Sequence, residues 1–111
     1  MARLFIPPLG SELILAADWT FSLFAEYRNT ALFKALKLKE PRDKYGCYDP
    51  NLSAPVALPA GTTLFVRRYY IRQGMKGFDS VTFSAKIGKK QHRFWVKLED
   101  ANRMEFDFVE H

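Results

Sequence analysis

Cationic and aromatic side chains in the second half of the chain are the residues whose spacing points most directly to chemistry. Along Arg93-Phe94-Trp95-Val96-Lys97, alternation places Arg93, Trp95 and Lys97 on one face of a strand. Cations contact phosphate groups and flat rings stack on bases, so this triplet is typical of a nucleic-acid-binding surface. Tryptophan and arginine are also enriched in protein–protein hot spots, which leaves the kind of partner open.

The positive charge is concentrated in one stretch. The whole chain has 17 Lys and Arg against 12 Asp and Glu, whereas residues 61–100 have nine against three. We expect these cations on neighbouring strands, with Tyr70 and Trp95 facing outward among them. The candidate binding residues are Arg67, Arg68, Tyr70, Arg72, Lys89, Lys90, Arg93, Trp95 and Lys97, and Lys76 and Lys86 add to the same charge. The alternative is a solvated sheet face whose tryptophan packs under a loop or against residues 18–39.

Enzymatic and metal chemistry find little support in the sequence. Cys47 is the one cysteine, and the two histidines, His92 and His111, form no His-x-x-x-His pair. The adjacent carboxylates Glu99 and Asp100 fit a turn after the strand that ends at Leu98, with Asp100 or Asn102 bonded to local backbone. The phosphate-loop patterns GxxxxGK[ST] and GxGxxG are absent. We therefore expect a non-enzymatic protein without a cofactor or a metal.

Alternating apolar residues predict a hairpin after residue 80. Val81, Phe83, Ala85 and Ile87 share one strand face, a polar turn follows at 88–91, and residues 93–98 alternate again. A last short strand is predicted from Met104, Phe106 and Phe108.

Residues 63–72 allow two registers. Strict alternation after Leu64 and Val66 would bury two arginines, which is costly for charges without partners. A bulge at 67–68 instead returns Tyr69 and Ile71 to the inner face and leaves Tyr70 outward, and we favour it.

The first half is organised by proline and glycine. Residues 8–15 and 59–66 each begin with Pro-x-Gly and a hydroxyl residue before apolar alternation, so both are predicted strand starts.

Residues 19–27 favour a strand over a helix because they are rich in aromatic residues, and Asn29 begins a predicted short helix near 29–38. Residues 26–29 form a polar cluster directly after this strand. We expect Arg28 to contact Glu26 or the backbone and close the end of the sheet, in preference to the alternative that the cluster is a recognition element. Residues 40–60 hold four of the six prolines and are predicted to be a loop or crossover.

These elements predict a small, mainly β fold in one globular domain over residues 1–111. With 48% hydrophobic residues the chain can form a core, and five or six short strands favour a strongly bent antiparallel sheet or a partly open SH3-like or OB-like barrel. A single cysteine and a proline-containing start without a signal-peptide pattern predict a cytoplasmic protein, and no apolar run is long enough to span a membrane.

Two longer patterns resemble small proteins of bacteriophages and prophages. They are LxLxxDWxFxLFxEYRN at 13–29 and LPAGTTLFVRRYYIRQGxxxFDSVTF at 58–83, followed by FWVKLED, so the likeness covers most of the chain outside 37–57. The resemblance implies a compact, non-enzymatic protein of the host cytoplasm that binds a host enzyme or defence complex.

The leading prediction is a binding module whose basic, aromatic sheet face holds nucleic acid or another polyanion. The rival prediction is a protein that docks on an acidic surface of a host protein and inhibits or modulates it. An open sheet edge allows either a monomer or a homodimer.

Overall fold

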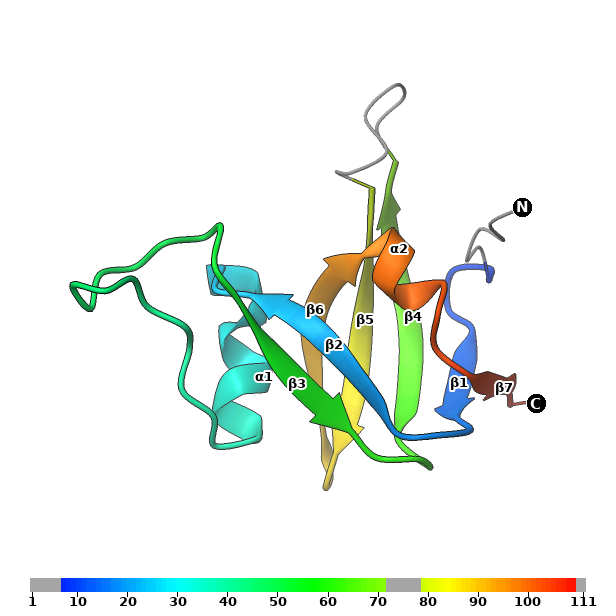
Figure 1. The fold of residues 1–111 in the computed structure, drawn as a ribbon. Helices are drawn as coiled ribbons and strands as arrows, with labels where there is room; N and C mark the ends of the chain where they lie inside the picture. The colour runs from blue at the N-terminus through cyan, green and yellow to red at the C-terminus, as the bar shows by residue number, and fades with distance from the viewer. Residues whose placement is uncertain (1–6, 72–78, 110–111) are drawn as a thin grey trace.

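The structure is a computed structural model that describes residues 7–71 and 79–109. Its strands form two antiparallel sheets. The elements in chain order are β1 (Glu12–Leu15), β2 (Trp19–Phe24), the 3-10 helix η1 (Tyr27–Asn29), α1 (Thr30–Ala35), β3 (Ser53–Leu58), β4 (Thr63–Tyr70), β5 (Ser80–Ile87), β6 (Lys90–Lys97), α2 (Leu98–Ala101) and β7 (Phe106–Phe108). Strands β6-β5-β4-β1-β7 make one sheet, and β2-β3 make a second that crosses in front of it (Figure 1). The predicted mainly β class, with a short helix near 29–38, is confirmed.

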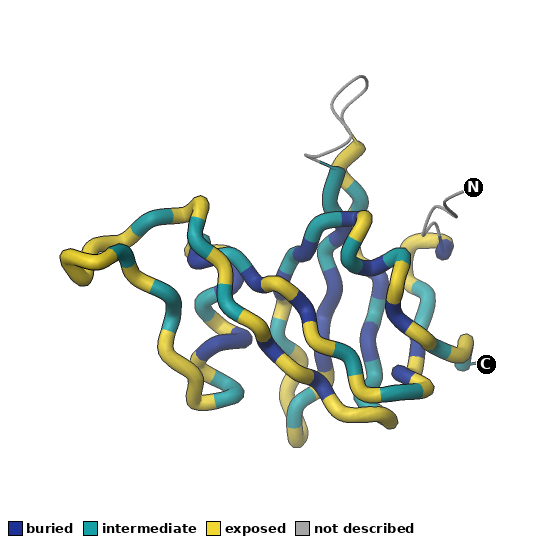
Figure 2. Tube along the Cα trace, in the orientation of Figure 1, coloured by how far each residue is buried: buried dark blue, intermediate teal, exposed yellow. Residues whose placement is uncertain are grey.

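The hydrophobic core lies between the two sheets. The Phe21 ring of the smaller sheet lies 6.2 Å from the Phe83 ring and 5.6 Å from the Phe94 ring, measured between centroids. The predicted alternation on β5 and β6 holds, because Val81, Phe83, Ala85, Phe94 and Val96 are all buried. Figure 2 shows buried stretches of the larger sheet where the smaller sheet covers it. The opposite face of the larger sheet, which we call the outer face, carries the intervening polar residues.

The predicted bulge in β4 is confirmed. Val66 pairs with Phe83 and Arg68 pairs with Thr82, so Arg67 is the extra residue. The bulge turns Tyr69 toward the core and leaves Tyr70 52% exposed. The prediction that Ile71 faces inward is wrong: β4 ends at Tyr70, and Ile71, just beyond it, is 59% exposed.

The two Pro-x-Gly segments form matching turns. Pro8 O accepts from Ser11 N at 3.1 Å, and Pro59 O accepts from Thr62 N at 3.2 Å. Gly10 and Gly61 have φ of 84° and 89°, a left-handed conformation that disfavours side chains. The strands that follow, β1 and β4, pair antiparallel about Leu13 and Leu64, so both predicted strand starts are confirmed.

Residues 40–60 are predicted to be a loop or crossover, and this is wrong for Ser53–Leu58, which form the strand β3. Proline is tolerated there because Pro55 pairs with Ser22, whose N–H points away from β3 to Asp100 Oδ2 at 2.8 Å. In an antiparallel pair both residues at such a position turn their backbone groups outward, so the missing N–H of Pro55 costs no sheet hydrogen bond. Val56 and Leu58 are buried on the core side.

Asn29 joins η1 to the edge strand of the larger sheet. Its side chain is fully buried, its Oδ1 accepts from Trp95 N at 2.8 Å, and its Nδ2 donates to Phe24 O at 3.0 Å. In the described part of the chain β6 is the terminal strand of its sheet, so its outward N–H groups have no strand partner there. Asn29 supplies one of the missing acceptors and fixes η1 and α1 against β6.

We expect Asn29→Ala to lower the free energy of unfolding by about 2 kcal/mol, because the Trp95 N–H would lose its acceptor in a buried setting. Phe24 O keeps its bond from Glu26 N, so the loss is confined to one group. Urea denaturation measures the change. Asn51→Ala is the matched control, since Asn51 is exposed and is expected to cost less than about 0.5 kcal/mol. Equal stability of the two variants would contradict the role given to Asn29.

Tyr69 ties β4 to the first described residue. Its hydroxyl donates to Pro7 O at 2.6 Å, and burial raises the pKa of Tyr69 to about 12. The folded state therefore favours the neutral phenol more than the unfolded state does.

This raised pKa predicts a loss of stability in alkali. The contribution of the neutral Tyr69 phenol is complete below pH 10, the ordinary tyrosine pKa, and is lost as the pH rises toward 12. The free energy of unfolding, measured against pH, should fall more steeply over this window in the parent protein than in Tyr69→Phe. Parallel curves would show that Tyr69 does not titrate with a raised pKa.

Candidate binding groove

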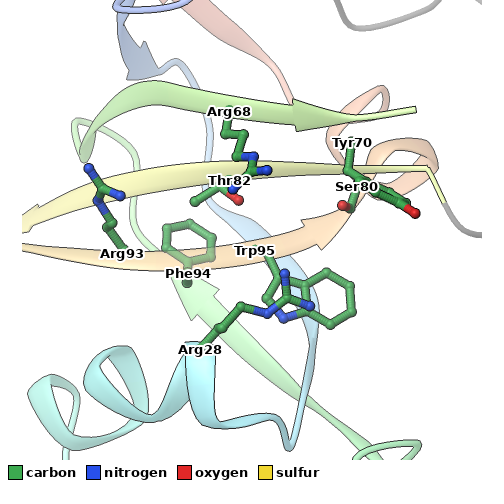
Figure 3. A pocket seen from close by; sticks show the side chains of 8 residues that line it. All are labelled: Arg28, Arg68, Tyr70, Ser80, Thr82, Arg93, Phe94 and Trp95. Atoms are coloured by element: carbon green, nitrogen blue, oxygen red, sulfur yellow. The ribbon is translucent and has the colours of Figure 1, made fainter. Parts of the chain in front are cut away.

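A groove of about 470 Å³ lies on the outer face of β4, β5 and β6, beside η1. Its lining residues are Arg28, Arg68, Tyr70, Ser80, Thr82, Arg93, Phe94 and Trp95, and we call this site the outer groove (Figure 3). Four of the nine residues predicted from the sequence, Arg68, Tyr70, Arg93 and Trp95, therefore come together in one depression.

Strand register explains why these side chains meet. Arg68 pairs with Thr82, and Thr82 pairs with Trp95, so the three form one row across the outer face. Adjacent strands are roughly 4.8 Å apart, which places Arg68 and Trp95 about 10 Å apart across the sheet. Without the bulge at Arg67 the alternation of β4 would direct Arg68 into the core. The bulge is therefore what brings Arg68 into the groove.

The groove contains guanidinium groups without matching carboxylates. Arg68 and Arg93 have no ion pair or side-chain hydrogen bond within residues 7–71 and 79–109, and none of the lining residues is acidic. Arg28 is different, since its guanidinium pairs with Glu26, with Nη2 2.8 Å from Oε2, and this bond raises the pKa of Arg28. An anion entering the groove would meet two cations that have no competing partner among the described residues.

Trp95 faces the groove, but its ring is already packed. The Phe24 ring stacks parallel to it with centroids 5.4 Å apart, and the Arg28 guanidinium carbon lies 5.1 Å from its centroid. Figure 3 shows Arg28 reaching from η1 to Trp95. Of the two arrangements expected for the tryptophan, packing against residues 18–39 is the one observed. Tyr70 is left as the more exposed aromatic ring of the groove.

The remaining candidates among the described residues lie outside the groove lining. Arg67 lies next to it and donates from Nε to Ser84 Oγ at 3.0 Å. Lys97 extends over the Phe24 ring at 5.3 Å and lines another depression with Asp100 and Arg103. Lys89 and Lys90 are exposed at the β5–β6 turn, and Lys86 is exposed near the same end of β5. Arg72 and Lys76 lie outside the described residues.

Four groove residues were not among the sequence candidates: Arg28, Ser80, Thr82 and Phe94. Alternation around Val81 already placed Ser80 and Thr82 outward, which was the available signal. For Arg28 the sequence predicts a contact with Glu26, and that ion pair is confirmed. Its position over Trp95 depends on the packing of η1 against β6, which no local pattern encodes.

The sequence predicts that Asp100 or Asn102 bonds to local backbone, but the Asp100 carboxylate makes a long-range contact instead. Its carboxylate accepts a hydrogen bond from the backbone N–H of Ser22 in β2, which is distant in the sequence. The pKa of Asp100 is raised, mainly because the carboxylate is partly buried. The carboxylate therefore closes the free edge of β2 instead of serving the outer groove.

Other kinds of site find no support in the described part of the chain. No three His, Cys, Asp or Glu side chains gather there in a way that could hold a metal ion. No helix among these residues is long and apolar enough to cross a bilayer. No protein-family model, curated protein or solved structure matches the chain.

The Glu26–Arg28 pair predicts how the groove responds to the removal of a negative charge. Glu26→Gln frees Arg28 for an anion, and we expect two- to fivefold tighter binding of pyrophosphate, equivalent to about 0.5–1 kcal/mol for a partly exposed pair. An NMR titration of backbone amides measures the affinity. Glu105→Gln removes an equal charge from an exposed residue near β7 and is the control. The same affinity in both variants would contradict direct competition by Glu26.

Proposed function

We propose that this protein binds nucleic acid through the outer groove and has no catalytic role of its own. The observation that carries the proposal is the pair Arg68 and Arg93, whose guanidinium groups lack a partner among the described residues, in a depression without carboxylates. Both side chains are exposed, so their charges are accessible to a ligand. Phosphate is the anion that their planar guanidinium groups fit bidentately.

The distribution of charge supports attraction over a distance. Arg67 lies beside the groove on the outer face, and Lys86, Lys89 and Lys90 lie toward one end of it. Clustered cations raise the local concentration of a polyanion and speed its encounter, while short-range contacts in the groove hold it. The chain as a whole has a formal net charge of +5.

An acidic protein surface is the second candidate partner. Three tyrosines outside the groove favour it, since Tyr27, Tyr45 and Tyr48 are 77%, 78% and 50% exposed, and exposed tyrosine is common at protein interfaces. The likeness to phage proteins, which implies a host protein target, points the same way. This candidate predicts binding that depends on those tyrosines and little on Arg68 and Arg93.

The test is fluorescence anisotropy of labelled DNA and RNA oligonucleotides, single- and double-stranded, at several salt concentrations. We expect affinity to fall steeply with salt, and Arg68→Ala or Arg93→Ala to weaken binding about tenfold each, because each removes a charged hydrogen bond to phosphate. For single strands, the slope of log K against log salt should decrease by about 0.7 for each phosphate that the variant no longer neutralises.

Arg103→Ala is the charge-matched control, because Arg103 is exposed and lines a different depression. It should change affinity much less than either groove variant. Equal weakening in all three variants would mean that overall charge, and not the outer groove, holds the polyanion. Absence of binding to any oligonucleotide at low salt would overturn the proposal.

A further inference from the structure

We infer that the nucleic acid bound is single-stranded, with one nucleotide seated in the outer groove, its phosphate between Arg68 and Arg93 and its base against Tyr70. This inference rests on the proposed function and names the form of nucleic acid that the groove admits.

The shape of the site favours a strand whose bases are free. Its floor is the outer face of β4, β5 and β6, and η1 brings Arg28 to one side, so the site is recessed (Figure 3). Its volume of about 470 Å³ lies within the range of roughly 300–1,000 Å³ typical of small-ligand pockets. A duplex keeps its bases stacked inside and presents phosphates on a convex exterior. A single strand can place an unstacked base in such a recess.

The lining has the chemistry of a nucleotide site and not only of a phosphate site. Tyr70 is half-exposed, and no aromatic ring of residues 7–71 and 79–109 stacks on it. Ser80 and Thr82 place two hydroxyl groups beside it, each able to donate to or accept from a base edge. A surface that binds phosphate alone has no need of an exposed ring and uncharged hydroxyls in its centre.

The spacing of these groups suits one nucleotide. Arg68 and Tyr70 are two residues apart on β4, with Tyr70 paired to Ser80 and Arg68 paired to Thr82. Two residues of a strand span about 7 Å, so the cation and the ring are separated by a distance that a phosphate and its own base can bridge. Trp95 cannot take the base, because Phe24 already stacks on its ring.

Trp95 does, however, offer a spectroscopic signal. The chain has two tryptophans, Trp19 and Trp95, and only Trp95 lines the outer groove. In a Trp19→Phe protein, the emission therefore reports on the groove alone.

The experiment titrates this Trp19→Phe protein with a single-stranded oligonucleotide and with a duplex of equal phosphate number, following anisotropy and Trp95 emission. We expect the single strand to bind at least tenfold more tightly and to change the emission. Tyr70→Ala should weaken single-strand binding by fivefold or more, since loss of base stacking has an effect of this order. Tyr70→Phe should retain the affinity, and Tyr48→Ala, on an exposed ring outside the groove, is the matched control.

The possible outcomes distinguish a preference for single strands from nucleic-acid binding as such. Equal or tighter duplex binding, sensitive to Arg68→Ala, would overturn the single-strand inference and leave nucleic-acid binding intact. Single-strand binding unaffected by Tyr70→Ala, or unaccompanied by a change in Trp95 emission, would overturn the placement of the base. Failure of both oligonucleotides to bind would remove the proposed function, and the inference with it.

Discussion

The buried side chain of Asn29 connects the parts of this structure that the sheets alone would leave apart. β6 ends its sheet, and η1 and α1 follow the last residues of the smaller sheet's first strand. By accepting from Trp95 N and donating to Phe24 O, Asn29 holds the end of β2 beside β6. The stacking of Phe24 on Trp95 and the position of Arg28 at the groove both follow from that junction. A polar side chain this deeply buried is tolerated because both ends of its amide are satisfied.

A second constraint acts from the other side of the groove. The core requires Leu64, Val66 and Tyr69 to face the smaller sheet, which is impossible with strict alternation along β4. Insertion of Arg67 as a bulge resolves this conflict and reverses the facing of the residues after it. The same insertion that preserves the core therefore exposes Arg68 and Tyr70 on the outer face. The bulge at Arg67 therefore determines both the packing of β4 in the core and the residues that β4 contributes to the outer groove.

Sequence periodicity predicted the elements whose burial is decided locally. The hairpin of β5 and β6, the bulge in β4 and the two Pro-x-Gly strand starts follow from alternation and turn chemistry, which act over a few residues. β3 was missed because Pro55 argues against a strand unless its outward direction is known, and that direction is set by its partner Ser22. The four groove residues found from the sequence lie on predicted strands. Arg28 and the covered ring of Trp95 depend on contacts across more than sixty residues of sequence, which alternation does not encode.

We propose that this protein holds a polyanion in the outer groove, and a map of the contact surface would locate the bound polyanion. Backbone amide shifts would be followed by NMR while a short single-stranded oligonucleotide is added. The structure predicts that the largest changes fall on Arg28, Arg68, Tyr70, Thr82, Arg93 and Trp95, with β3 and β7 unaffected. Shift changes concentrated instead around Tyr45 and Tyr48, with the shifts of the groove residues unchanged, would contradict binding in the outer groove.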